Sequence, residues 1–123
     1  MSNEIEVFNS CSDTPGYKIS NYGNILSIGR IIMRSSGRKQ TFKEKILKTQ
    51  INPKGYPTIT LRINGKKHCF EIHRLVAKCF VTNNDNKPLA HHEDGNKKNN
   101  YYKNLIWSTY SENIIHAYKN NLR

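Results

Sequence analysis

Residues 89–100 read LAHHEDGNKKNN and contain the side chains best suited to acid–base or metal chemistry in this chain. His91 and His92 are adjacent, two acidic residues follow them, and a glycine then leads into lysines and asparagines. An imidazole with its ordinary pKa of about 6.5 is mostly unprotonated at neutral pH, so it can accept a proton or bind a cation. Taken alone, the two histidines are better interpreted as incidental residues of a polar loop.

Two short strands are expected to hold this stretch in place. Residues 89–92 can form the first, ending at a turn over residues 94–96, and the apolar run LIWST at residues 105–109 forms the second. In the loop between them, the side chains of Asn99 and Asn100 are expected to bond loop backbone.

A helix should follow the second strand. The run from Thr109 to Glu112 has the T-x-x-E form of a capping box, which predicts a helix from residue 110 to about residue 120. The three elements then make a β-β-α arrangement, in which residues early in the helix face the end of the first strand.

Further upstream, the patterns predict mostly strands. Residues 17–34 suggest a small meander, residues 35–45 an exposed basic loop, and residues 46–51 a strand. Residues 56–63 alternate between polar and apolar side chains, and the Asn64-Gly65 pair predicts a type I′ hairpin to the strand at residues 66–72. The spacing then changes to a helical one, which predicts a short amphipathic helix over residues 73–81.

Three blocks of the sequence resemble the HNH endonucleases, in particular the phage and intron-encoded homing endonucleases of that superfamily. They are EIHRLVAKCF, AHHEDGNKKNN and NLIWSTYSEN, which occur in the family's order over roughly residues 56–117. Asn104 follows His92 by 12 positions and Asn113 follows it by 21 (104 − 92 and 113 − 92), as in the intron-encoded nickases. Upstream, YKISNYGNILSI resembles a NUMOD4-like N-terminal module, although EVFNSCSDTPG stands where such modules usually begin with tryptophan.

The resemblance implies an α+β fold: a small antiparallel β-sheet with a short helix, ending in a ββα-metal (His-Me finger) motif at about residues 89–120. It also implies two parts. Residues 1–45 would form a β-rich DNA-binding module, and residues 46–123 would form the nuclease domain.

The resemblance further implies a role for each residue of the site. His92 would be the general base, Asn104 the group that orients it, and His91 and Asn113 the two protein ligands of a divalent cation. His116 is a candidate additional ligand, because residues three apart share a helix face, and a solvated helix histidine is the alternative. At the end of a strand, both imidazoles could turn towards one phosphate.

The implied cofactor is one divalent metal ion, with Mg²⁺ as the physiological choice. Many relatives carry Asp or Asn where this chain has His91, and imidazole is a softer ligand than carboxylate. His91 therefore shifts the preference towards Mn²⁺, Co²⁺, Ni²⁺ or Zn²⁺.

The charge of the chain favours a nucleic-acid partner. Lys and Arg number 20 against 9 acidic residues, which gives a formal net charge of +11. Such a field attracts phosphates, so a nucleic acid is the expected partner. The resemblance to the HNH endonucleases implies that this partner is double-stranded DNA. The candidate DNA-binding residues are Arg30, Arg34, Arg38, Lys39, Lys54, Arg62, Lys66, Lys67, Arg74, Lys97 and Lys98.

Other functional classes fit less well. No apolar run approaches the roughly 18 residues of a membrane span, and the start MSNEIEVFNS lacks the features of a signal peptide, so an intracellular protein is expected. The resemblance implies a DNA phosphodiester hydrolase that nicks one strand, and we expect it to act as a monomer or weak homodimer. Two alternatives stay open: a catalytically silent DNA-binding or regulatory module on the same fold, and RNA as the substrate.

Overall fold

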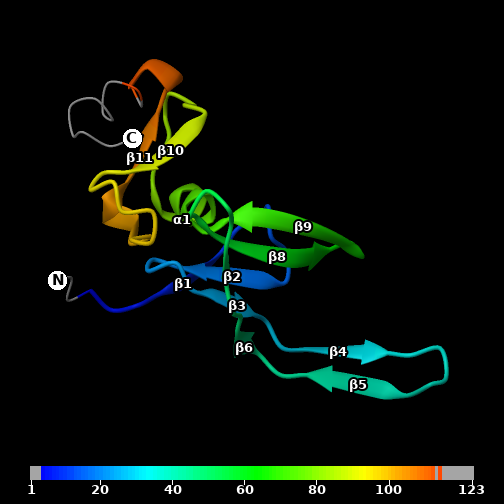
Figure 1. Ribbon diagram of the computed structural model, residues 1–123. Helices are drawn as coiled ribbons and strands as arrows, with labels where there is room; N and C mark the ends of the chain where they lie inside the picture. Colours follow the sequence, from blue (N-terminus) through cyan, green and yellow to red (C-terminus); the bar gives the residue numbers. More distant parts are fainter. Residues whose placement is uncertain (1–3, 113, 115–123) are drawn as a thin grey trace.

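In the computed structural model, which describes residues 4–112 and residue 114, small antiparallel sheets surround a short helix, α1 (Ile72–Phe80) (Figure 1). Leu75, Val76 and Ala77 are almost fully buried on this helix. The helix contacts β2, β8, β9, β10 and β11, so it is the element on which the sheets converge. The predicted α+β class and the short amphipathic helix are both confirmed.

The N-terminal sheet has the strand order β1-β2-β3-β6. Its strands are β1 (Phe8–Ser10), β2 (Tyr17–Ser20), β3 (Ile25–Ser27) and β6 (Lys45–Ile46). Ile19 and Ile25 face the core and are fully buried, as the expected meander requires.

A separate hairpin extends from this sheet. It consists of β4 (Arg30–Met33) and β5 (Lys39–Phe42), which pair antiparallel, and it projects away from the rest of the molecule in Figure 1. The prediction of a loop over residues 35–45 is therefore wrong in part. The polar, aperiodic sequence of β5 concealed a strand because neither of its faces packs against a core.

The third sheet carries the predicted hairpin. It contains β7 (Gln50–Ile51), β8 (Pro57–Ile63) and β9 (Lys66–Glu71). Asn64 and Gly65 have φ values of 53° and 79°, as a type I′ turn requires, so this prediction is confirmed. The single strand expected over residues 46–51 is instead split, because β6 pairs with β3 and β7 pairs with β8.

The last two strands form a two-stranded ribbon against α1. β10 (Leu89–His92) and β11 (Leu105–Ser108) pair in the register His92↔Leu105 and Leu89↔Ser108. The capping box is confirmed, because the Thr109 N–H donates to Glu112 Oε1 at 2.9 Å and the Glu112 N–H donates to Thr109 Oγ1 at 3.1 Å. Most of the helix predicted after it lies outside the described residues.

Residues near the N-terminus contact the loop that joins β10 to β11. The Tyr102 N–H, at the start of the 3₁₀ turn η1 (Tyr102–Asn104), donates to the Asn21 carbonyl at 2.9 Å, and the rings of Tyr22 and Tyr101 stack at 5.0 Å. The Tyr102 hydroxyl also donates to Glu4 Oε1 at 3.0 Å. These contacts fix the segment that follows Asn100. In the described part of the chain, no helix is long and apolar enough to cross a membrane.

Candidate active site

His91 and His92 point to opposite faces of the β10–β11 ribbon. His92 lies opposite Leu105 on the face that is buried against α1, whereas His91 lies opposite Ile106, which is 39% exposed. The two rings do not share a face because strand geometry, with its alternating side chains, extends to the last residue of β10. A phosphate that meets both histidines must therefore lie across the end of the ribbon.

The His92 ring is held by a buried hydrogen bond. Its Nε2 lies 2.8 Å from Oδ1 of Asn100, and both residues are more than 90% buried. Because the amide oxygen can only accept, Nε2 carries the proton and Nδ1 is the basic nitrogen of the ring. The close approach of Asn100 needs Gly23, since a Cβ there would lie 2.9 Å from the Asn100 Cβ.

Two further rings pack around His92. The ring centroid of His73 lies 4.8 Å from that of His92, and the Tyr56 ring lies 5.1 Å from His73 and 6.1 Å from His92. His73 follows the helix N-cap, Glu71, at the second position of α1, so it does not cap the helix. His73 instead packs in the core, where it is 5% exposed.

The environment of His92 favours its neutral form. Burial lowers the pKa of His92 below its ordinary value, against the opposing effects of the Asn100 hydrogen bond and of Asp94 and Glu71. The ring is therefore unprotonated at neutral pH, as a proton acceptor must be.

Asn104 does not contact His92. Its Nδ2 donates to Asp94 Oδ1 at 3.0 Å and to the Asn99 carbonyl at 2.9 Å, while its Oδ1 accepts the Asp94 N–H at 3.2 Å. The hydrogen bond to the His92 ring expected from Asn104 is made by Asn100. The reason is that η1 carries Asn104 to the neck of the loop, opposite Asp94, and leaves Asn100 beneath the His92 ring.

The turn predicted after His92 is confirmed. The Gly95 N–H donates to the His92 carbonyl at 3.0 Å, and the Asn96 N–H donates to Asp94 Oδ1 at 2.8 Å. Asn99 donates its side-chain N–H to Asp94 Oδ2 at 2.9 Å. Asp94 thus organises the loop, and these bonds lower the pKa of its carboxyl group below the ordinary value, against the effect of desolvation.

His91 is oriented by Ser108. Its Nδ1 lies 3.0 Å from the Ser108 hydroxyl, on the same face of the ribbon. Such a contact is what a metal-binding histidine needs, because a partner at one ring nitrogen fixes the ring and directs the other towards a cation. The remaining candidates, Asn113 and His116, lie outside the described residues. Within residues 4–112 and 114, no cluster of three or more His, Cys, Asp or Glu side chains could hold a metal ion.

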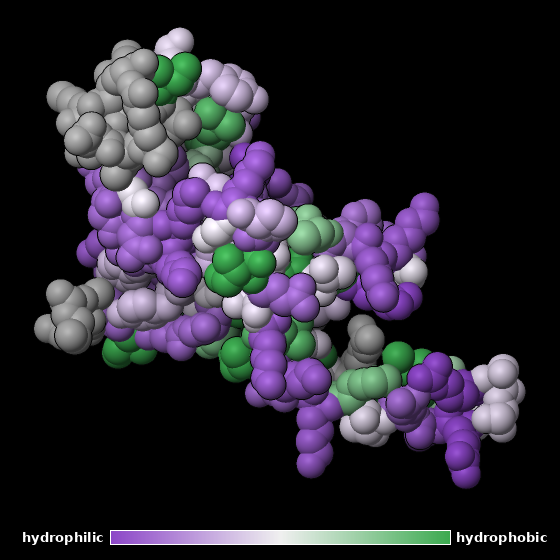
Figure 2. Space-filling model, in the orientation of Figure 1, coloured by the Kyte–Doolittle hydropathy of each residue, from purple (hydrophilic) through white to green (hydrophobic). Residues whose placement is uncertain are grey.

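The candidate DNA-binding residues gather at three places. Arg34, Arg38 and Lys39 lie at the exposed end of the β4–β5 hairpin, where the Arg34 side chain also contacts Gln40. This hairpin shows hydrophilic and hydrophobic side chains side by side in Figure 2. Arg30 opens the same hairpin at β4. A second group is at the turn of the β8–β9 hairpin and consists of Arg62, Lys66 and Lys67.

The third place is the loop after His92, where Lys97 crosses to the sheet. Its Nζ donates to the Lys54 carbonyl at 2.8 Å and lies 4.8 Å from the centre of the Tyr56 ring. The positive charge of Lys97 is thereby close enough to lower the pKa of His92. Lys98 is exposed in the same loop.

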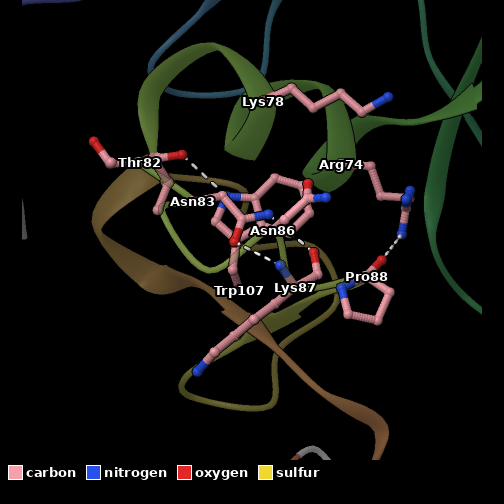
Figure 3. A pocket seen from close by; sticks show the side chains of 9 residues that line it. Arg74, Lys78, Thr82, Asn83, Asn86, Lys87, Pro88 and Trp107 are labelled. Atoms are coloured by element: carbon pink, nitrogen blue, oxygen red, sulfur yellow. Dashed lines mark hydrogen bonds between the residues drawn. The ribbon is translucent and has the colours of Figure 1, made fainter.

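Arg74 is apart from these groups. It lines an open polar pocket of about 490 Å³ with Trp107, Asn83 and Lys87, and its guanidinium donates to the Pro88 carbonyl at 3.2 Å (Figure 3). The structure thus brings His92, Lys97 and Lys54 together and leaves Arg74 elsewhere.

Sequence reasoning misses three of the residues around the histidines. Asn100 is expected only to bond loop backbone, and Tyr56 and Ser108 have no assigned role. The pairing of Asn100 with His92 across eight positions depends on the folded loop, and no sequence spacing signals it.

The chain is similar to a known sequence motif and to known proteins. Residues 6–62 match the model of the NUMOD4 motif. The chain is 39% identical over 98 residues to the DNA endonuclease I-HmuI of Bacillus phage SP01, covering 80% of this chain and 49% of that protein. It is 36% identical over 107 residues to the uncharacterized HNH endonuclease L245 of Acanthamoeba polyphaga mimivirus, covering 87% of this chain and 28% of that protein.

A solved structure described as "DNA binding and cleavage by the HNH homing endonuclease I-HmuI" has a similar fold. The TM-score is 0.75 at 32% identity, with 95% of this chain and 60% of that chain covered. This chain spans between about a quarter and a half of the length of these curated relatives.

Proposed function

This chain is a homologue of the HNH endonucleases that carries a NUMOD4 motif, and on that premise we propose that it is a metal-dependent DNA endonuclease. Its reaction would be hydrolysis of one phosphodiester bond in double-stranded DNA. The observation that carries the proposal is the state of His92, a buried, neutral imidazole whose Nε2–H is bonded to Asn100.

His92 would act as the general base through Nδ1. This nitrogen takes a proton from a water molecule, and the water oxygen attacks the phosphorus as the bond to the 3′ oxygen breaks. The products are a 5′-phosphate and a 3′-hydroxyl. General-base catalysis of this kind contributes about 10²–10⁴-fold to a rate.

His91 would hold the cation together with Asn113. Two protein ligands leave most of the coordination sphere to water and phosphate oxygens, which suits hydrolysis. A bound divalent cation would polarise the phosphate and stabilise the departing oxygen. We propose Mg²⁺ as the physiological ion, with Mn²⁺, Co²⁺, Ni²⁺ and Zn²⁺ as alternatives that the imidazole ligand favours.

One site cuts one strand, so we propose nicking as the elementary reaction. The exposed basic residues of the β4–β5 hairpin would hold the duplex through its phosphates, which makes affinity fall steeply with salt.

The test is conversion of supercoiled plasmid to open circles by purified protein in EDTA, Mg²⁺, Mn²⁺ and Zn²⁺. His92→Ala serves as the control for contaminating nuclease. Metal-dependent nicking by the wild type that disappears in the variant supports the endonuclease. If both proteins are inert in every metal but still shift DNA in a gel, the chain is a DNA-binding module on a nuclease fold.

A further inference from the structure

Three aromatic rings from three different elements meet at the proposed general base. Tyr56 directly precedes β8, His73 lies in the first turn of α1, and His92 ends β10. All three pairs of centroids are within 4.8–6.1 Å, and the Tyr56 ring is nearly parallel to both imidazoles, with interplanar angles of 29° and 25°. The stack therefore joins the central helix and the third sheet to the catalytic ribbon.

His73 is the fixed member of this stack. His73 is 5% exposed and lies in the first turn of α1, which contacts the strand β10 that carries His92. Burial, with smaller contributions from the charges of His92 and Arg74, lowers the pKa of His73 to about 3. A second histidine thus packs against the first without adding a positive charge beside it.

The hydrogen bond to Asn100 fixes His92 at one atom only, Nε2. A hydrogen bond at one ring atom still lets the imidazole rotate about its terminal side-chain torsion, which is broad for His. A second ring packed against it restricts this freedom, because rotation would drive the two rings into each other. The His73 ring packs in this way, at a tilt of 47° to the His92 ring. The direction of Nδ1, which must meet the water, depends on both restraints.

We propose that His73, backed by Tyr56, is a positioning residue whose ring holds the His92 imidazole so that Nδ1 faces the attacked phosphate. This inference rests on the proposed function. The restraint is supplied by the aromatic ring of His73 and needs no proton transfer to or from it. His73 itself touches neither water nor phosphate in the reaction.

Three variants separate this role from ordinary packing. His73→Ala removes the ring, and His73→Phe keeps an aromatic ring while losing the nitrogens. Val76→Ala is the matched control, because Val76 is fully buried in the same helix but contributes no ring to the stack. Cleavage is measured under single-turnover conditions with saturating protein, at a temperature where all variants are folded, and DNA affinity is measured in EDTA.

The proposal predicts that His73→Ala slows cleavage about 10–100-fold with DNA affinity unchanged, as expected when a catalytic group is misplaced by about 1 Å. His73→Phe should restore the rate to within about threefold of wild type, and Val76→Ala should cleave at the wild-type rate. If Val76→Ala slows cleavage as much as His73→Ala does, His73 contributes to the rate only through core packing. Failure of His73→Phe to restore the rate would overturn the role of the ring.

A second measurement does not depend on cleavage. With ¹⁵N-labelled histidine, the His92 ring in the wild type and in His73→Phe should give one set of NMR signals, with the proton on Nε2. In His73→Ala these signals should broaden or double. If His92 stays ordered in His73→Ala, the positioning role is wrong even for an active nuclease. If the signals behave as expected but wild type and His92→Ala are equally inert, the positioning is right and the endonuclease assignment is wrong.

Discussion

The described part of the chain contains two two-stranded ribbons, whose strands are all 4 residues long and which differ in burial. In β10–β11, Ala90, His92, Leu105 and Ser108 are all at least 91% buried against the rest of the protein. In β4–β5, Ile31 and Met33 are 65% and 61% exposed, and every residue of β5 is exposed. The same backbone pattern therefore occurs once as a packed part of the core and once as a projecting arm.

The difference suggests a division of labour. A general base, the role proposed for His92, must be held within a fraction of an ångström, and in the packed ribbon the His92 ring contacts both Asn100 and His73. A side chain that contacts phosphates through its charge must be exposed but does not need such accurate placement. The exposed hairpin carries three such side chains, Arg34, Arg38 and Lys39. Each ribbon should accordingly respond to mutation in its own way.

The largest expected effect is on the free energy of unfolding, which should respond differently to mutations in the two ribbons. Leu105→Ala removes a side chain that is 3% exposed and should lower the free energy of unfolding by about 2–5 kcal/mol. Ile31→Ala, the matched change on the exposed hairpin, should alter it by less than about 0.5 kcal/mol. Urea unfolding followed by circular dichroism measures both. Equal losses would mean that the hairpin is packed in solution and would remove the contrast.

Acid should destabilise the packed ribbon next. Because the folded pKa of His73 is about 3 and its unfolded value about 6.5, the unfolded chain binds more protons between these pH values, and stability falls as the pH drops below 6.5. Between pH 7.5 and pH 5 the loss from His73 should be about 2 kcal/mol.

The control for this loss is His73→Phe, which cannot titrate at that position. Carboxylates such as Asp94 titrate in both proteins, so only the difference between the two stability curves reports on His73. Parallel curves for wild type and variant would show that His73 is not buried in its neutral form.

A smaller effect, on cleavage rate and stability, should distinguish Asn100 from Asn104. Asn100→Ala removes the partner of His92 Nε2 and should slow single-turnover cleavage about 10-fold or more at an unchanged DNA affinity. Asn104→Ala breaks the bonds to Asp94 and the loop backbone, so it should lower stability by about 1–3 kcal/mol and affect the rate less. The reverse pattern would restore Asn104 as the residue that orients the general base.

The smallest effect on the fold should come from the arm. Replacing Arg34, Arg38 and Lys39 together by alanine should leave the unfolding free energy unchanged within about 0.5 kcal/mol. If each residue neutralises one phosphate, the slope of log affinity against log salt should decrease by about 2–3. Lys48→Ala, an exposed lysine outside the predicted set, is the control and should change the slope by much less. An unchanged slope in the triple variant would exclude the arm from the DNA interface.

The sequence was most informative where local chemistry and core packing agree. The bounds of β10, the Asn64-Gly65 turn and the Thr109–Glu112 capping box follow from turn propensity, alternation and cap chemistry, and all three are confirmed. The strand β5 was missed because an exposed hairpin does not need alternating apolar residues.

The site was less predictable than the fold. His91 and His92 could be identified as candidates from their types and spacing, and their placement on opposite faces follows from strand geometry once β10 is known to include both. The partner of His92 could not be deduced, because Asn100 reaches it through a loop whose shape depends on Asp94 and on the close approach to Gly23. Asn113 and His116 keep their predicted roles as hypotheses.

The most direct test of the division between the ribbons is a crossed measurement on one fluorescent DNA duplex. His92→Ala and the Arg34, Arg38 and Lys39 triple-alanine variant are each assayed for binding in EDTA and for single-turnover cleavage in Mg²⁺ or Mn²⁺ at saturating protein. We predict that His92→Ala binds like wild type but loses cleavage by about 10²–10⁴-fold, while the triple variant binds more weakly yet cleaves at the wild-type rate once saturated. Loss of binding in His92→Ala, or a cleavage defect in the saturated triple variant, would contradict the account.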